Sequence, residues 1–154
     1  MHMGKSKELF STTMGFTLVE MLLVIAVIVV LFGITAPIYF SFQTRNDLDL
    51  AATTFVYVLR RAQTLAEGGE SDAEWGVRTD PGRITLFRGS NFATRDQNFD
   101  EIFTFPQHIV ASGNAEIIFM RITGIPVSPG IMVLTNASGA LRTVSINVKG
   151  SVDY

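Results

Sequence analysis

The chain has 154 residues, 47% of them hydrophobic, and a formal net charge of −2. This length suits one modest domain, and the small net charge implies no overall attraction to nucleic acid or anionic lipid. The sequence contains no cysteine, which excludes disulfides, thiolate metal sites and cysteine nucleophiles.

An apolar segment near the amino terminus dominates the sequence. Residues 16–36, FTLVEMLLVIAVIVVLFGITA, contain one ionisable group, Glu20. As a helix they would extend roughly 31 Å, about the thickness of the hydrocarbon core of a bilayer. Lys5 and Lys7 precede the segment, so the positive-inside rule places the N-terminus in the cytoplasm and residues from 45 onward outside. We therefore expect a transmembrane helix within residues 16–44.

Three ordinary interpretations of this segment compete. A secretory signal peptide has a shorter apolar core followed by a small-residue cleavage site, which residues 37–40 do not provide. A plain single-pass anchor fits the length but gives Glu20 no role, and a buried helix of a soluble protein does not need so long an apolar run. A carboxylate in a membrane helix costs about 2.5–3.5 kcal/mol at mid-bilayer and is a functional-site hypothesis by default. Either Glu20 reaches the headgroups, or a positive charge on another copy of the helix neutralises it.

The stretch Gly15-Phe16-Thr17-Leu18-Val19-Glu20, followed by the long apolar run, resembles the class III signal of type IV pilins and type II secretion pseudopilins. In that family a prepilin peptidase cuts between the glycine and the phenylalanine and methylates the new amino terminus. The resemblance implies a cleaved leader of residues 1–15, an N-methylated Phe16, and a glutamate that stays in the mature chain. The leader departs from the family pattern because residues 11–14 separate Gly15 from the nearest basic residue.

The resemblance has a physical basis in the charge of Glu20. Cleavage would create an ammonium group four residues before Glu20, on about the same face of a helix. In a filament of staggered helices, the amine of one subunit would lie against Glu20 of its neighbour. A buried ion pair roughly breaks even, whereas an unpaired buried charge is costly. Glu20 is therefore predicted to be an assembly residue that specifies the register of the subunits.

Gly33 and Pro37 interrupt the apolar segment. Proline removes a backbone donor and clashes with the preceding turn, which predicts a helix break or kink over residues 33–37. The alternative is that both residues are simply common in membrane helices. In the pilin family this stretch is thought to unwind when subunits pack into a filament.

Beyond Gln43 the sequence has the pattern of an amphipathic helix, which we expect over residues 45–67. Gly68-Gly69 is a stop signal. Apolar residues recur at steps of three and four, and polar residues lie off this stripe. We expect the stripe to lie on a small sheet. Its members are Leu48, Ala52, Phe55, Leu59, Ala62 and Ala66.

Residues 70–154 are predicted to form strands and turns. A hairpin is expected from residues 74–78 and 83–88 around Pro81-Gly82, and a second from residues 131–135 and 141–148. Between them we expect a polar loop over 89–100, short strands at 102–105 and 109–111, and a long strand over 115–122. The predicted fold class is α+β and pilin-like: a long N-terminal helix, transmembrane and then amphipathic, packs on a small, mostly antiparallel β-sheet in a globular head of residues 45–154. This order of elements is similar to that of minor pseudopilins of type II secretion and related minor type IV pilins.

The sequence offers no catalytic constellation, so no enzyme activity is expected. His2 lies in the predicted leader and His108 stands alone, which leaves a histidine metal site or a Ser-His-Asp triad incomplete. The acidic run over residues 67–74 matches no EF-hand spacing and predicts a solvated loop. Major pseudopilins bind calcium in a C-terminal loop, but only Asp153 is available here. No cofactor and no metal are expected.

DNA is the rival partner, because some minor pilins bind DNA for natural transformation. A DNA site needs cations clustered on one surface. The candidate cations are spread over 67 residues, which is ordinary surface content, so nucleic acid is not the expected partner: Arg83, Arg88, Arg95, Arg142 and Lys149.

These observations together predict a structural, and more specifically a minor, subunit of a type IV pilus or type II secretion pseudopilus. The resemblance implies four partners: the prepilin peptidase, other pilin or pseudopilin subunits, the inner-membrane assembly platform, and inner-membrane lipid before assembly. The chain would be a single-pass protein of the bacterial inner membrane with a periplasmic or extracellular head, and would then enter the filament. Two alternatives stay open: a DNA-binding minor pilin, and an uncleaved single-pass membrane protein with an extracytoplasmic binding domain.

Overall fold

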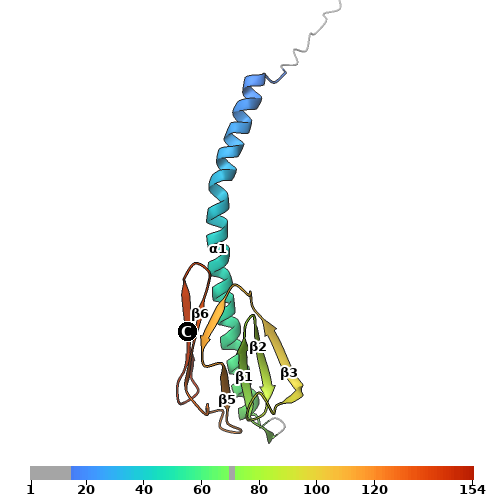
Figure 1. The fold of residues 1–154 in the computed structure, drawn as a ribbon, viewed down its shortest axis with the longest axis vertical. Coiled ribbons are helices and arrows are strands. Elements are labelled where there is room, and N and C mark those ends of the chain that lie inside the picture. Colours follow the sequence, from blue (N-terminus) through green and yellow to red (C-terminus); the bar gives the residue numbers. More distant parts are fainter. Residues whose placement is uncertain (1–14, 70–71) are drawn as a thin grey trace, which may run out of the picture. The chain divides into compact units, whose positions relative to one another are not determined.

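The computed structural model describes residues 15–69 and 72–154, apart from the side chains of residues 34–41. Of the predicted leader, only Gly15 belongs to the described residues. The chain divides into two units, residues 1–39 and 40–154. Within the described residues one helix and eight strands follow one another (Figure 1): α1 (Leu18–Glu67), β1 (Trp75–Asp80), β2 (Arg83–Arg88), β3 (Asp96–Thr104), β4 (Val110–Gly113), β5 (Glu116–Phe119), β6 (Gly130–Thr135), β7 (Leu141–Ile146) and β8 (Val152–Asp153).

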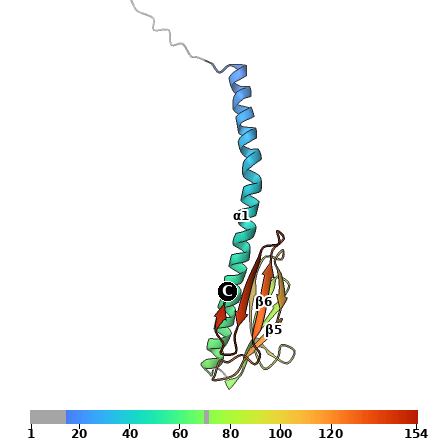
Figure 2. The same ribbon diagram turned by 90° about the vertical axis from the view of Figure 1, so that its left-hand side faces the viewer.

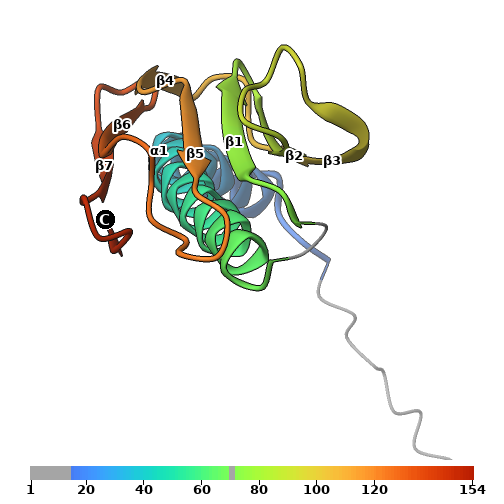
Figure 3. The same cartoon turned by 90° about the horizontal axis from the view of Figure 1, so that it is seen from below.

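The amphipathic part of α1 forms the centre of the hydrophobic core of residues 40–154. All six residues of the predicted stripe are at most 1% exposed: Leu48, Ala52, Phe55, Leu59, Ala62 and Ala66. Ala51 and Val58 are buried as well, so the covered surface is wider than the stripe. The view along the helix shows the reason, because β6 and β7 lie on one side of α1 while β1 and β5 lie on another (Figure 3). The predicted stripe is thus confirmed and extended.

Two antiparallel sheets of four strands each cover the helix. The strand order is β3-β2-β1-β5 in the first sheet and β4-β6-β7-β8 in the second. In Figure 2, β5 and β6 lie beside the green part of α1. The predicted hairpins are confirmed as the β1–β2 and β6–β7 pairs. In the first of them, Gly82 has a φ of 75°, a conformation that glycine adopts without strain.

α1 ends at Glu67, directly before the predicted stop signal Gly68-Gly69. Gly69 has a φ of 62°, and its N–H donates to the carbonyl of Ala66 at 3.2 Å. The N–H of Gly68 donates to the carbonyl of Thr64 at 2.9 Å. A left-handed glycine just past the last helical residue is the usual way to satisfy carbonyls that have no partner within the helix.

The polar loop predicted over residues 89–100 is too long. β3 begins at Asp96, which lies opposite Arg88 of β2, and the predicted strand at 102–105 is its final part. The first residues of β3 are polar and exposed. An edge strand tolerates such residues because one of its sides has no partner strand, and charged side chains there discourage further pairing. A polar run in the sequence is therefore the same signal for a loop and for an exposed edge strand.

The strand predicted over residues 115–122 is also too long, because β5 ends at Phe119. Ile122 has a φ of 70°, and its N–H donates to the carbonyl of Ala66 at 2.8 Å. This hydrogen bond turns the chain onto the end of α1. A tertiary contact has here overridden the strand propensity of Ile122, since that propensity depends on context.

The other observed strand boundaries differ from the predicted ones by a few residues. The strand predicted at 109–111 is β4, which begins at Val110 and ends at Gly113. β7 ends at Ile146, two residues before the predicted end, and a turn leads to β8, which was not predicted. In this turn the Asn147 side chain accepts hydrogen bonds from the N–H groups of Lys149 and Ser151, at 2.8 and 3.0 Å.

Ion pairs tie both sheets to the helix. Arg61 of α1 donates from Nε and Nη2 to the carboxylate of Glu101 in β3, at 2.9 and 2.7 Å. The hydrogen bond with Glu101 raises the pKa of Arg61 above its ordinary value. Arg142 of β7 donates from Nε to Oδ1 of Asp49 at 2.7 Å. Pairs as exposed as these contribute about 1 kcal/mol or less, so they orient the sheets while apolar burial supplies the stability.

Replacing Phe55 by Ala should lower the free energy of unfolding by about 3–5 kcal/mol, because it leaves a cavity in the core. Denaturant unfolding of the full chain in detergent would measure this. The control is Tyr57→Ala on the same helix, where the side chain is 54% exposed and the expected loss is about 1 kcal/mol or less. Equal losses in the two variants would contradict the packing described here.

Candidate functional site

The first part of α1 exposes apolar side chains on all sides. From Leu18 to Phe32 every large apolar side chain is between 45% and 77% exposed. A hollow on this helix is itself lined only by apolar residues, among them Leu23, Ala26 and Val30. A helix that is apolar all round is stable only when it is buried. Lipid or another protein must therefore cover this segment, which we call the apolar helix segment (residues 18–33).

A membrane helix was predicted within residues 16–44. Among the helical residues that the structure describes, no stretch has both the length and the hydropathy that a membrane crossing requires. The predicted span is not confirmed.

Thr17 is the N-cap of α1 and was missed by the sequence interpretation. Its Oγ1 accepts a hydrogen bond from the N–H of Glu20 at 3.2 Å, and its carbonyl accepts one from the N–H of Met21 at 3.2 Å. A threonine followed three residues later by a glutamate is the spacing of a capping box. The signal was therefore present in the sequence, inside the same six residues that resemble the pilin motif.

The start of α1 differs from the expected assembly geometry in the position of Phe16. Phe16 was expected to lie on about the same helix face as Glu20, but α1 begins only at Leu18. Phe16 therefore precedes the helix, and its side chain is 78% exposed. Its backbone nitrogen is not held on the helical surface that carries Glu20.

Glu20 lies in the first turn of α1. An acidic group there is favoured by the partial positive charge of a helix N-terminus. Among the described residues its carboxylate takes part in no ion pair, and the residue is exposed. The structure thus gives Glu20 a local role in starting the helix and leaves its carboxylate accessible to a second molecule.

The predicted cleavage junction lies in an open segment. Gly15 and Phe16 belong to no helix or strand. Among the described residues beyond its chain neighbours, none has an atom within 4 Å of the position that a Cβ on Gly15 would occupy. A peptidase binds a peptide bond that lies outside helices and strands more readily, and the cut after Gly15 stays a prediction.

The two predicted break points, Gly33 and Pro37, lie within α1, which continues through both residues. The side chain of Pro37 is outside the described residues. The helix break at these positions stays a prediction, since unwinding was expected of the assembled filament.

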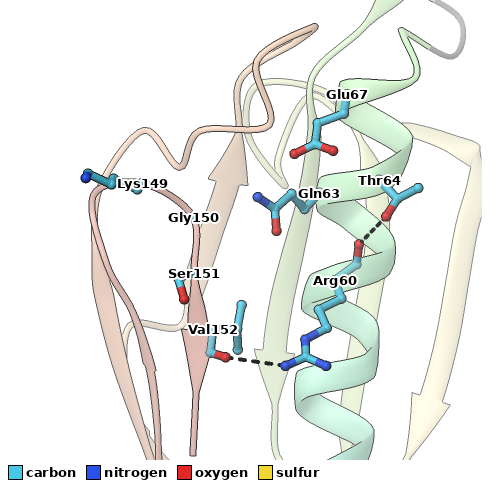
Figure 4. Close-up of a pocket in the computed structure, with 8 residues that line it drawn as sticks. All are labelled: Arg60, Gln63, Thr64, Glu67, Lys149, Gly150, Ser151 and Val152. Atoms are coloured by element: carbon cyan, nitrogen blue, oxygen red, sulfur yellow. Dashed lines mark hydrogen bonds between the residues drawn. The ribbon is translucent and has the colours of Figure 1, made fainter.

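The head contains an open polar hollow of about 480 Å³ between the end of α1 and the β7–β8 turn. Figure 4 shows Gln63 and Glu67 pointing from the helix toward this turn. Arg60 Nη2 donates to the carbonyl of Val152 at 3.5 Å, and Thr64 Oγ1 donates to the carbonyl of Arg60 at 2.9 Å. The lining residues of the hollow include no histidine, and Glu67 is the one carboxylate among them.

Candidate metal ligands are not gathered in the described part of the chain, where no three His, Cys, Asp or Glu side chains lie together. His108 lies beside Asp47, with Nε2 3.4 Å from Oδ2. In the acidic run, Asp72 forms an ion pair with Arg121.

Four of the five cations considered for DNA binding are engaged by carboxylates: Arg83 with Asp80 (3.6 Å), Arg88 with Asp96 (3.7 Å), Arg95 with Asp100 (2.9 Å) and Arg142 with Asp49 (2.7 Å). A phosphate would have to displace or approach these carboxylates. Arg83 and Arg88 lie in β2 and Arg95 directly before β3, all at the first sheet, whereas Arg142 lies in β7 of the second sheet. The described residues therefore provide no clear electrostatic surface for a nucleic acid backbone.

The arrangement of a long N-terminal helix on antiparallel sheets is the pilin-like α+β fold, as the sequence predicted. No protein-family model and no curated protein sequence matches the chain. Among solved structures, the minor pseudopilin EpsH from the type 2 secretion system of Vibrio cholerae is similar to it, with a TM-score of 0.53. The two are 13% identical, and the similarity covers 70% of this chain and 94% of EpsH. At this identity the likeness concerns the fold.

Replacing Thr17 by Val should weaken the start of α1, because Val has the same shape but cannot accept the hydrogen bond from Glu20. The loss is expected to be about 1 kcal/mol. Hydrogen exchange of the amides of residues 19–21, in the full chain in detergent, should therefore become about five-fold faster. Thr17→Ser is the matched control and should keep its protection. Unchanged exchange in Thr17→Val would show that Thr17 is not the cap.

Proposed function

We propose that this chain is a subunit of a pilin-type filament, either a type IV pilus or a type II secretion pseudopilus. One observation carries the proposal: the apolar helix segment is exposed on all sides, while the head is complete without it. Every residue of the hydrophobic core lies between Leu48 and Val152. A segment that adds nothing to its own core and, apart from Glu20, exposes apolar surface is suited to contacts with lipid or with other subunits.

In the proposed pathway, a prepilin peptidase first cleaves the chain after Gly15 and methylates Phe16. The new ammonium group would lie two residues before α1. Because Phe16 is not part of the helix, the amine is free to turn toward a neighbouring subunit. There it would meet Glu20, whose carboxylate lies in the first helical turn.

The proposed ion pair between the Phe16 amine of one subunit and Glu20 of the next would specify the register of the two helices more than it would stabilise the filament. A buried pair of opposite charges roughly breaks even, whereas a charge left alone costs several kcal/mol. Any stagger of the helices that separates the amine from Glu20 would therefore be disfavoured. Apolar contacts along residues 16–44 would supply the attraction, and the pair would select one arrangement among many.

Partners and location follow from the same proposal. Other pilin-type subunits, an inner-membrane assembly platform and, before assembly, inner-membrane lipid would contact the apolar helix segment. The head would face the periplasm. The fold similarity to a minor pseudopilin supports a minor subunit, and the mostly paired cations of the head do not favour the DNA-binding alternative.

Processing can be tested by mass spectrometry of the chain isolated from membranes of cells that contain a prepilin peptidase. The mature chain should begin at Phe16 and carry one added methyl group, and Gly15→Leu should leave the leader attached. A wild-type chain that keeps residues 1–15 in such cells would exclude the filament proposal and favour an uncleaved membrane protein.

The role of Glu20 can be tested with two substitutions that separate its charge from its place in the capping box. Glu20→Gln removes the charge but keeps a side chain that suits this position of a capping box, whereas Glu20→Leu removes both. We expect normal processing of both variants and at least about a ten-fold loss of both from sheared filaments, since a tenfold change corresponds to about 1.4 kcal/mol. Normal incorporation of Glu20→Gln would show that the charge is not required for assembly.

A further inference from the structure

Two glycines of the head leave room for polar side chains of α1 at the hollow beside the β7–β8 turn. A Cβ on Gly150 would lie 2.5 Å from Nε2 of Gln63. A Cβ on Gly124, in the segment between β5 and β6, would lie 2.5 Å from Oε1 of Glu67. A larger residue at either position would push the amide or the carboxylate aside, because packed atoms do not approach so closely. The backbone of two loops therefore packs directly against Gln63 and Glu67.

The side chains at the hollow have few partners within the chain. Figure 4 shows Arg60, Gln63 and Glu67 in a row along α1. Residues three or four positions apart are neighbours on one face of a helix, so the row carries a guanidinium, an amide and a carboxylate. In the described part of the chain, the side chains of Gln63 and Glu67 form no hydrogen bond or ion pair. The Arg60 side chain forms one long hydrogen bond, to the carbonyl of Val152.

The opposite wall of the hollow is a turn that is fixed by its own hydrogen bonds. The N–H of Gly150 donates to the carbonyl of Asn147 at 3.0 Å, and the N–H of Asn147 donates to the carbonyl of Ser151 at 3.1 Å. The Asn147 side chain accepts from Lys149 and Ser151. An extended peptide binds by adding to a free strand edge, which this turn does not offer. The Lys149 ammonium points away from the hollow (Figure 4).

An aromatic ring lies beside the polar row. A second hollow, of about 290 Å³, is lined by Tyr57 and shares Arg60 and Thr64 with the first. Tyr57 lies one turn before Arg60 on α1 and is 54% exposed. Its ring packs edge-on against Phe103, with the ring centres 5.9 Å apart. The exposed part of the ring is an apolar surface next to hydrogen-bonding groups.

We propose that the groove along α1 from Tyr57 to Glu67 binds a neutral oligosaccharide. A hydroxyl group both donates and accepts hydrogen bonds. The row presents the matching set, because the Arg60 guanidinium only donates, the Glu67 carboxylate only accepts, and the Gln63 amide does both. Each of these planar groups can contact two neighbouring hydroxyls of a sugar, while the C–H face of a sugar ring stacks on Tyr57.

The charges of the groove favour an uncharged ligand. Glu67 would repel a phosphate or sulfate bound beside Arg60, and Arg60 would repel a metal cation bound beside Glu67. Val152, the large apolar residue of the polar hollow, is buried and offers little surface to an apolar ligand. A ligand rich in hydroxyls and without charge avoids these repulsions. The inference goes beyond the proposed function and does not depend on it, because the groove belongs to the head of a single chain.

The proposal is tested with an array of immobilised neutral oligosaccharides built from hexoses and N-acetylhexosamines. The full chain is applied in a polyoxyethylene detergent, which contains no sugar. We expect binding to one or more of these glycans, unchanged between about 50 and 200 mM salt, a range over which binding to a polyanion falls steeply. Gln63→Ala and Glu67→Ala should each weaken binding to the strongest glycan about ten-fold, through the loss of hydrogen bonds to the ligand.

Two controls separate the groove from its surroundings. Lys149→Ala removes a charge from the rim of the hollow and should bind normally, since the ammonium points away from the ligand. Tyr57→Phe should also bind normally, whereas Tyr57→Ala should bind about five-fold more weakly, because the ring and not its hydroxyl contacts the sugar. Circular dichroism should show the wild-type fold in every variant.

Several outcomes would overturn the inference. They are the absence of binding across the array, unchanged binding in both Gln63→Ala and Glu67→Ala, and binding that is lost in Lys149→Ala or falls steeply with salt. Capture of the chain by a matched array of charged peptides in place of the glycans would overturn it as well. None of these results would bear on cleavage after Gly15 or on the role of Glu20, which the filament experiments test separately.

Discussion

Apolar helix surface must be removed from water, and α1 meets this requirement in two ways. Beyond Leu48 the helix carries one apolar stripe, and two antiparallel sheets of the same chain bury it almost completely. Before residue 34 the helix carries one ionisable side chain, Glu20, and all its large apolar side chains are exposed among the residues that the structure describes. The change in pattern along one helix therefore separates a self-sufficient head from a segment that needs other molecules.

Polar contacts orient the two sheets on α1 and cap the start of the helix. Arg61–Glu101 and Arg142–Asp49 fix β3 and β7 against α1, and carboxylates engage most of the cations that could have met a nucleic acid. At the start of the helix, Thr17 satisfies the N–H of Glu20 and leaves the carboxylate without an ion pair among the described residues. The same glutamate thus suits the helix N-terminus of a single chain and a positive charge brought by a neighbour.

The differences between expected and observed elements have physical causes. β3 starts earlier than predicted because an edge strand tolerates polar residues. β5 ends earlier because Ile122 donates its N–H to the end of α1, a contact between residues 56 positions apart in sequence. β8 has only two residues, too few for any periodic signal. In the candidate site, the Thr17 cap could have been predicted, since its spacing to Glu20 is that of a capping box.

The sequence by itself determined the fold class, the stripe on α1, both hairpins and the unusual position of Glu20. These depend on periodicity and turn residues, which are local properties of the chain. Only the tertiary structure decided that one sheet is covered by its own loop while Val110, Ile131 and Leu141 of the other sheet stay exposed. That outcome depends on which side of each strand meets the helix and where a distant segment folds back, and local patterns do not encode either.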